Sequence, residues 1–171
     1  ASEMGDADAA TYKSKIDDSK YSEYAYNCAT RMVGGENKDG SFTSFNWGNT
    51  ASAGTLSLAL HSDLLSDSEN AKVKETILAA ADEYIKMENK QGYGIPYTYD
   101  GEGYNDPNNL NPDIIINGYE WGSNSMVINN CIVMAYAYDL TSDINYMNGV
   151  TTAMDYLFGT NPLSFSFVTG Y

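Results

Sequence analysis

The chain has 171 residues, of which 43% are hydrophobic and 19% charged, and Tyr and Gly each occur 15 times. This balance excludes a disordered chain and predicts a globular fold. The formal net charge of −14, with only nine Lys and Arg residues, excludes nucleic acid and anionic lipid as partners and favours a neutral polymer. No apolar run reaches the ~20 residues of a membrane-spanning helix, so no membrane partner is expected.

Helical apolar spacing begins in the first third of the chain. Two helices are expected at about 3–14 and 19–32. Further along, leucines recur at every fourth position as Leu56, Leu60 and Leu64. Residues four apart lie on one side of a helix, so this spacing predicts a third helix with an apolar face.

A longer helix is expected to follow. Ser66 and Glu69 have the spacing of a capping box, in which each side chain accepts a hydrogen bond from the other residue's backbone N–H. The apolar stripe behind this box consists of Val73, Ile77, Ala81 and Tyr84. The glycine at position 92 is expected to mark the end of the helix.

A central loop from Asn89 to Tyr119 interrupts the helical pattern with interleaved Gly, Pro and Tyr. Loops of this length in a compact domain are usually functional or disordered. The aromatic residues in this loop favour a functional role. They include Tyr93, Tyr97, Tyr99 and Tyr104.

Two further helices are predicted before Gly159 and Pro162, which stop the second of them. Their apolar stripes are Val127, Cys131, Met134 and Tyr138, and then Tyr146, Val150, Met154 and Leu157. The junction 140–146 resembles 15–21, since each has an Asp followed three residues later by a Tyr. The Asp can cap a new helix while the Tyr packs inward, so we expect an all-α fold of stacked αα-hairpins.

Three ordered motifs carry a family resemblance. They are Tyr119-Glu120-Trp121-Gly122-Ser123-Asn124-Ser125, then 155–162 (DYLFGTNP), then 166–171 (SFVTGY). In this order and at about this spacing they resemble the YxWGSNS, DYLLGxNP and SYVTGYG motifs of the glycoside hydrolase family 9 cellulases. Weaker similarity at 45–50 and 92–97 extends the resemblance over most of the chain.

The resemblance implies a fold and an activity. The family fold is an (α/α)6 barrel of about twice this length, so residues 1–171 are expected to be the central part of a catalytic domain and to form about half of the barrel. The last motif is cut at Tyr171. The family consists of secreted enzymes that hydrolyse β-1,4-glucosidic bonds in cellulose with inversion, and a signal peptide would lie outside this chain.

No catalytic residue is expected in this chain. The resemblance places the family's base on an aspartate pair in a DAGD motif and its acid on a glutamate near the C-terminus, and neither motif is present, nor is the family's His-His-Arg motif. Glu120 is expected to be a solvated loop charge. The chain alone is therefore expected to be inactive, with acid and base on other segments of the domain.

The resemblance does imply residues that bind the substrate. Trp121 is expected to stack on a sugar ring from the cleft side of a loop-to-helix junction. The other expected contacts to a β-glucan or cello-oligosaccharide are Tyr119, Tyr97, Ser125 and Tyr171. Ser123, Asn124 and Ser125 are expected first of all to cap the helix that follows.

No cofactor is expected to be required, although the family includes members with a structural calcium ion. Glu3 would match one ligand position of that site. Gly48 and Asn49 stand where the family has a second carboxylate, and calcium favours charged oxygen ligands. Cys28 and Cys131 lack zinc-site spacing, and we expect two small buried helix residues in preference to a disulfide.

Two other functions remain open at this point. One is a non-catalytic helical module that binds carbohydrate or another protein, and the other is an (α/α)6 glycosidase acting on xylan or mixed-linkage glucan. In each case half a barrel would leave apolar helix faces for the remaining segments of the domain to cover. The face expected to need such a partner contains Met126, Val127, Ile128, Ile132, Val133 and Met134.

Overall fold

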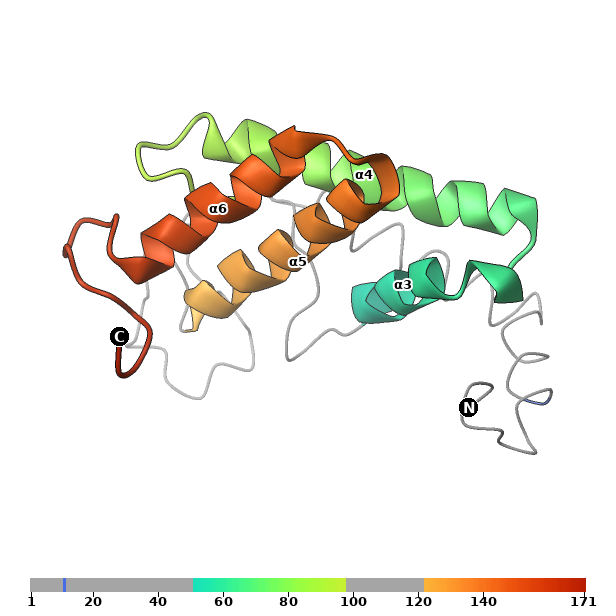
Figure 1. Cartoon of the computed structure of the whole chain (residues 1–171), viewed down its shortest axis with the longest axis horizontal. Helices are drawn as coiled ribbons and strands as arrows, with labels where there is room; N and C mark the ends of the chain where they lie inside the picture. The colour runs from blue at the N-terminus through green and yellow to red at the C-terminus, as the bar shows by residue number, and fades with distance from the viewer. Residues whose placement is uncertain (1–10, 12–50, 98–121) are drawn as a thin grey trace, which may run out of the picture.

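The computed structural model describes Thr11, residues 51–97 and residues 122–171 (Figure 1). Within these residues all regular structure is helical. The helices are α3 (Ala51–Leu60), a 3-10 helix η1 (Ser62–Leu64), α4 (Asp67–Glu88), α5 (Ser123–Thr141) and α6 (Ile144–Phe158). The helices expected at 3–14 and 19–32 lie outside the described residues except for Thr11, which is helical.

The start of α4 confirms the predicted capping box. The Ser66 Oγ accepts a hydrogen bond from the Glu69 backbone N–H at 3.4 Å, and the Glu69 carboxylate accepts one from the Ser66 N–H at 2.8 Å. The helix ends at Glu88, earlier than the glycine at 92 predicts. The Lys90 and Gln91 N–H groups bond to carbonyl oxygens three residues back, so the last turn tightens and the helix stops.

The hairpin between α5 and α6 has the predicted junction. Ser142 adopts a left-handed conformation with φ of 60°, and its N–H bonds to the Tyr138 carbonyl oxygen at 2.6 Å. Asp143 then caps α6, since its Oδ1 accepts the Asn145 N–H at 3.0 Å. Tyr146 is only 8% exposed, so it packs inward as the sequence predicts.

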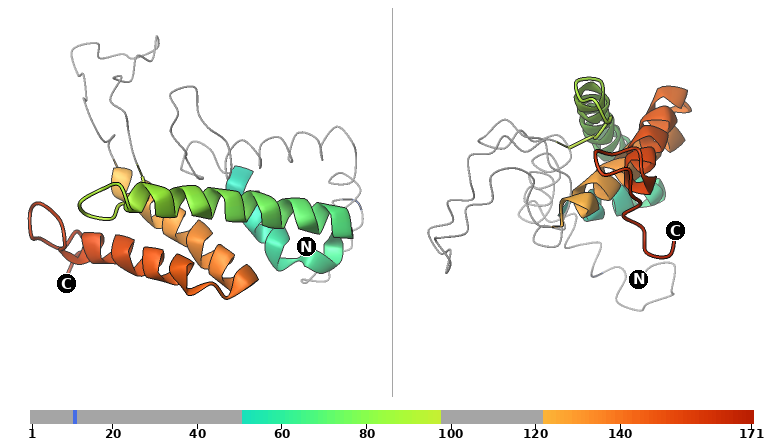
Figure 2. Two further views of the ribbon diagram at one scale, coloured as in Figure 1. Left: turned by 90° about the horizontal axis from the view of Figure 1, so that it is seen from above. Right: turned by 90° about the vertical axis from the view of Figure 1, so that its left-hand side faces the viewer.

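The helices pack as successive antiparallel hairpins. Figures 1 and 2 show that α4 and α6 run in the same direction, whereas α5 runs the opposite way and packs against both. Ile77, Ala81 and Tyr84 of the α4 stripe are buried in this core with apolar residues of α5 and α6, and Val73 is partly buried against it. Burial of one large apolar side chain stabilises a fold by about 1.5–3 kcal/mol, so these contacts hold the hairpins together.

The expected uncovered face of α5 is only partly found. Ile128 and Ile132 are 42% and 37% exposed. The other four residues of that face are buried in the core, because α5 lies between α4 and α6 and is covered from two sides: Met126, Val127, Val133 and Met134. Among the described residues, no helix is long and apolar enough to cross a membrane.

A glycine allows α6 to approach α4 closely. A Cβ atom added at Gly149 would lie 2.4 Å from the Ile85 Cδ1 and 2.7 Å from the Glu88 Oε2. Both distances are far below van der Waals contact, so a larger residue would force the ends of these side chains to move. Gly149 is therefore in the middle of α6 for packing reasons, despite its low helix propensity.

Candidate functional site

Three segments meet at one end of the hairpins. Because α4 and α6 run parallel and α5 runs the other way, the loop after α4, the start of α5 and the segment after α6 all lie at the same end (Figure 1). This end contains the described part of the central loop, residues 89–97, and the C-terminal segment 159–171. Three of the five predicted substrate-binding residues belong to these segments.

The described part of the central loop is fixed by side-chain amides. Asn130 on α5 is fully buried, and its Nδ2 donates to the Pro96 carbonyl oxygen at 2.7 Å. Gln91 Nε2 donates to the Tyr97 carbonyl oxygen at 3.0 Å. At Gly94, where φ is 60°, an added Cβ would lie 2.2 Å from the Thr152 Cγ2, so the loop also packs directly on α6.

Tyr97 and Ser125 occupy different environments at this end. Tyr97 is only 2% exposed and belongs to the core, so its ring is not open to solvent. Ser125 is exposed, and its Oγ donates to the Gly122 carbonyl oxygen at 2.7 Å.

The expectation that Ser123, Asn124 and Ser125 cap α5 is wrong. Gly122, with φ of 78°, takes the N-cap position without a side-chain hydrogen bond, and the three polar residues form the first turn. The motif glycine is suited to this left-handed conformation, so the N-cap lies one residue ahead of Ser123.

Asn161 organises the segment after α6. Its Nδ2 donates to the carbonyl oxygens of Tyr156 and Phe165, both at 2.8 Å, and its Oδ1 accepts the Leu163 N–H at 3.0 Å. The Phe167 N–H bonds to the Leu157 carbonyl oxygen at 2.9 Å. The chain after Gly159 therefore folds back on the end of α6.

Tyr171 lies on an aromatic surface that this turn creates. It is 81% exposed, and its ring centroid is 4.9 Å from that of Phe158, with 49° between the ring planes. Tyr156 and Phe167 form a second ring pair, with centroids 5.7 Å apart. The Tyr171 ring thus has a supported position and an open face, which stacking on a planar ligand requires.

The remaining predicted site residues lie outside the described residues. These are Trp121, Tyr119 and the calcium candidate Glu3. Within residues 51–97 and 122–171 no group of three His, Cys, Asp or Glu side chains could hold a metal ion. Cys131 is a buried free cysteine, and burial, together with the nearby Glu88 charge, raises the pKa of its thiol to about 12.

Comparison with known proteins assigns the chain to a family. The sequence model described as glycosyl hydrolase family 9 matches residues 2–171. The chain belongs to this family. Among curated relatives, a cellulose 1,4-beta-cellobiosidase of Acetivibrio thermocellus is 39% identical over 129 residues, which cover 74% of this chain and 13% of that protein. Endoglucanase C of Cellulomonas fimi is 35% identical over 127 residues, covering 74% of this chain and 10% of that protein.

Solved structures of family 9 endoglucanases share the fold. Endoglucanase J30 superposes with a TM-score of 0.62 at 21% identity, covering 91% of this chain and 24% of that chain. A metagenome-derived family 9 endoglucanase gives a TM-score of 0.60, covering 90% of this chain and 24% of that chain. These enzymes have the (α/α)6 barrel, so the prediction of αα-hairpins from such a barrel is confirmed.

Sequence reasoning missed the residues that position this end of the family 9 hairpins. Asn130 and Asn161 carry the hydrogen bonds described above, and sequence reasoning gave neither of them a role. Asn161 belongs to the motif at 155–162, whereas Asn130 follows the motif 119–125 by five residues. A usable signal existed for Asn130, because it stands next to Cys131 on a helix side that is otherwise apolar. A buried side-chain amide needs hydrogen-bond partners, so this position predicts a hydrogen bond from the Asn130 side chain to a backbone group of a neighbouring segment.

Proposed function

We propose that the protein of which this chain is a part hydrolyses β-1,4-glucosidic bonds in cellulose with inversion. The observation that carries the proposal is the family 9 match over residues 2–171. It is supported by relatives whose names are cellulose 1,4-beta-cellobiosidase and endoglucanase. Residues 1–171 act as part of the catalytic domain, and the remaining segments of that domain are their partners.

This chain supplies scaffold and substrate contacts. Trp121 stacks on a glucose unit, and Tyr119, Ser125 and Tyr171 line the same cleft. The exposure of Tyr171 and Ser125 at one end of the hairpins supports these roles. The burial of Tyr97 favours a role in which it supports the cleft wall over a direct contact with the sugar.

The chemistry belongs to the other segments. An inverting glycosidase needs one carboxylic acid to protonate the leaving oxygen and one carboxylate to activate water, about 6.5–9.5 Å apart. Cleft residues from this chain hold the glucan so that the bond to be cleaved lies between those two groups. The cleft residues must be held rigidly, since a small error in the position of the bound glucan lowers the rate of hydrolysis steeply. The anchoring of residues 91–97 by Asn130 and of the C-terminal turn by Asn161 provides that rigidity.

Two accompanying properties are part of the proposal. The protein acts outside the cell, where its polymeric substrate is found. The reaction requires no cofactor, and a structural calcium ion with Glu3 as one ligand is disfavoured because Gly48 and Asn49 stand in place of a second carboxylate. Dialysis of the complete protein against a chelator should therefore leave its melting temperature unchanged, and a fall that added calcium reverses would show that the ion is bound.

The test is an activity assay of the complete protein. Hydrolysis of carboxymethylcellulose and cellopentaose, with the α-anomer formed first, is the expected result. Trp121→Ala should weaken cello-oligosaccharide binding by about 1–3 kcal/mol, by analogy with aromatic stacking on planar ligands. Faster cleavage of xylan would instead assign another glycosidase activity. Binding of cello-oligosaccharides without any hydrolysis would make the protein a carbohydrate-binding module.

A further inference from the structure

A pocket of about 470 Å³ lies between α4 and α6, and none of its described lining residues belongs to α5 or to the segment after α6. Its described lining residues include none of Lys, Arg or His. They do include three carboxyl and three amide side chains: Asp82, Glu88, Asp143, Asn89, Asn145 and Asn148. The pocket is therefore rich in hydrogen-bond acceptors and negatively charged.

Glu88 is the unusual member of this set. It is only 7% exposed, and its Oε1 has no hydrogen-bond partner among the described residues. Gly149 on α6 makes room for the carboxyl group, since an added Cβ there would lie 2.7 Å from the Oε2. A buried carboxyl group without a partner costs free energy, so a missing donor is expected at this position.

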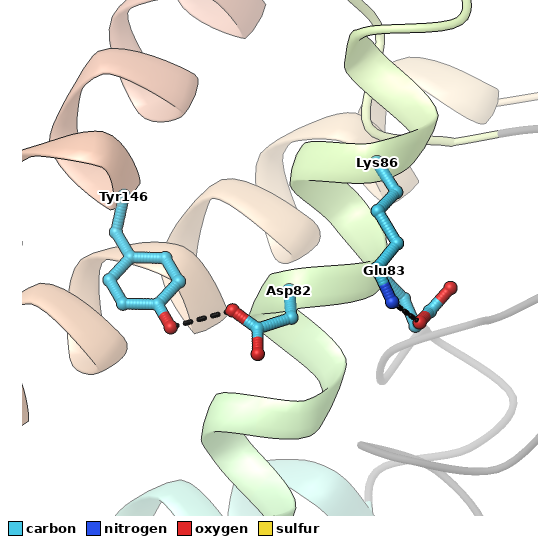
Figure 3. Close-up of polar contacts among 4 residues, drawn as sticks. All are labelled: Asp82, Glu83, Lys86 and Tyr146. Carbon is cyan, nitrogen blue, oxygen red and sulfur yellow. Dashed lines mark hydrogen bonds and ion pairs between the residues drawn. The ribbon is translucent and has the colours of Figure 1, made fainter.

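The other two carboxylates each use one oxygen to fix the pocket wall. Asp82 Oδ1 accepts the Tyr146 hydroxyl at 2.7 Å, which ties α6 to α4 (Figure 3). Asp143 Oδ1 accepts the Asn145 N–H at the start of α6. The Lys86 ammonium, also on α4, pairs with Glu83 on another side of that helix and does not line the pocket (Figure 3).

We propose that this pocket binds an organic cation of the guanidinium or alkylammonium class. Such a cation carries the positive charge that the described lining lacks, and its several N–H groups can donate to the carboxyl oxygens of the pocket. A bare metal ion fits less well, because the described residues contain no cluster of three metal-ligating side chains and the volume far exceeds one ion. The inference does not depend on the proposed hydrolase activity.

Binding of a cation should be coupled to loss of a proton. Burial raises the pKa of Glu88 to about 8, so this carboxyl is mostly protonated at pH 7. Among the described residues, the titratable groups around it are Asp82 on α4, Cys131 on α5, and Asp143 and Tyr146 at the start of α6. A cation beside Glu88 would favour the carboxylate and release close to one proton.

The experiment is calorimetric titration of the complete protein with ethylguanidinium at pH 7. Two buffers of different ionisation heat give the number of protons released, and N-ethylurea serves as a neutral ligand of the same shape. We expect ethylguanidinium to bind with release of about 0.9 proton, whereas N-ethylurea should not bind. Propylammonium should compete for the same site.

Variants separate the pocket from the rest of the acidic surface. Glu88→Gln should abolish proton release and weaken binding about tenfold or more. Asp143→Asn keeps an effective helix cap, so it should weaken binding while proton release remains. The control is Glu75→Gln, because Glu75 is an exposed residue of the same helix, and it should change neither quantity.

Three results would overturn the proposal. The first is absence of ethylguanidinium binding, and the second is equal binding of N-ethylurea. The third is binding that Glu88→Gln and Asp143→Asn leave unchanged. If Glu88→Gln does not fold, Asp143→Asn alone decides, since unaltered affinity in that variant places the cation elsewhere.

Discussion

Replacing Glu88 by Gln should remove a pH dependence from the stability of the protein. Burial raises the pKa of this carboxyl from its ordinary value of 4.5 to about 8. The folded state therefore holds a proton between these two pH values that the unfolded state has released. Stability from this group is fully present below about pH 4.5, falls as pH rises, and is lost above about pH 8.

The size of the effect follows from the same shift. A change from 4.5 to about 8 corresponds to about 4–5 kcal/mol of unfolding free energy. The loss should proceed at up to about 1.4 kcal/mol per pH unit between those limits. Gln resembles the neutral acid in shape and carries no charge, so Glu88→Gln should match the original protein at low pH and exceed its stability at pH 9.

Urea denaturation of the complete protein at pH 5, 7 and 9, in buffers without amines, measures this difference. Glu75→Gln is the matched control, because Glu75 is an exposed glutamate on the same helix. The control should follow the original protein at each pH. If the Glu88→Gln and original proteins lose stability in parallel across the range, the carboxyl is not buried as described and the reasoning is wrong.

Four further variants test helix packing and capping by urea denaturation of the complete protein. Gly149→Ala should cost about 1–3 kcal/mol by overpacking. Gly54→Ala should stabilise by about 0.5–1 kcal/mol, because an added Cβ there meets no atom of the described residues within 4 Å beyond its own stretch of helix. Equal effects would contradict the close approach of the helices. Tyr146→Phe removes the bond to Asp82 and should cost about 1.5–3 kcal/mol, and a neutral result would show that water replaces it. Ser66→Ala should cost about 1 kcal/mol, and no change would mean that the capping box contributes nothing.

Local sequence signals predicted the helices and their junctions. The capping box at Ser66, the cap at Asp143 and the stop at Gly159 each depend on one or two neighbouring residues, and all three are found in the structure. The start of α5 was predicted less well. A serine in the motif suggested the cap, but the glycine before it takes that position in a left-handed conformation.

Contacts between helices were harder to predict, because they depend on which elements become neighbours. Glu88 follows Tyr84 by four residues and so continues the buried stripe of α4, a signal that the charge of the side chain obscured. From the sequence, Gly149 could be recognised only as a residue of low helix propensity within a helix. The close approach of α4 explains why a glycine stands there, and the sequence does not show that approach. Tyr97 was expected in a cleft, yet its burial depends on contacts that no local pattern records.

The Asn161 side chain also bears on chemical ageing of the protein. Spontaneous deamidation of an asparagine begins when the backbone nitrogen of the next residue attacks the side-chain carbonyl, and Pro162 has no N–H to lose in that step. An aspartate at this position would place a carboxylate oxygen against the Tyr156 and Phe165 carbonyl oxygens, which now accept bonds from Nδ2 at 2.8 Å. The proline therefore keeps the turn after α6 intact during long exposure to warm, neutral solution.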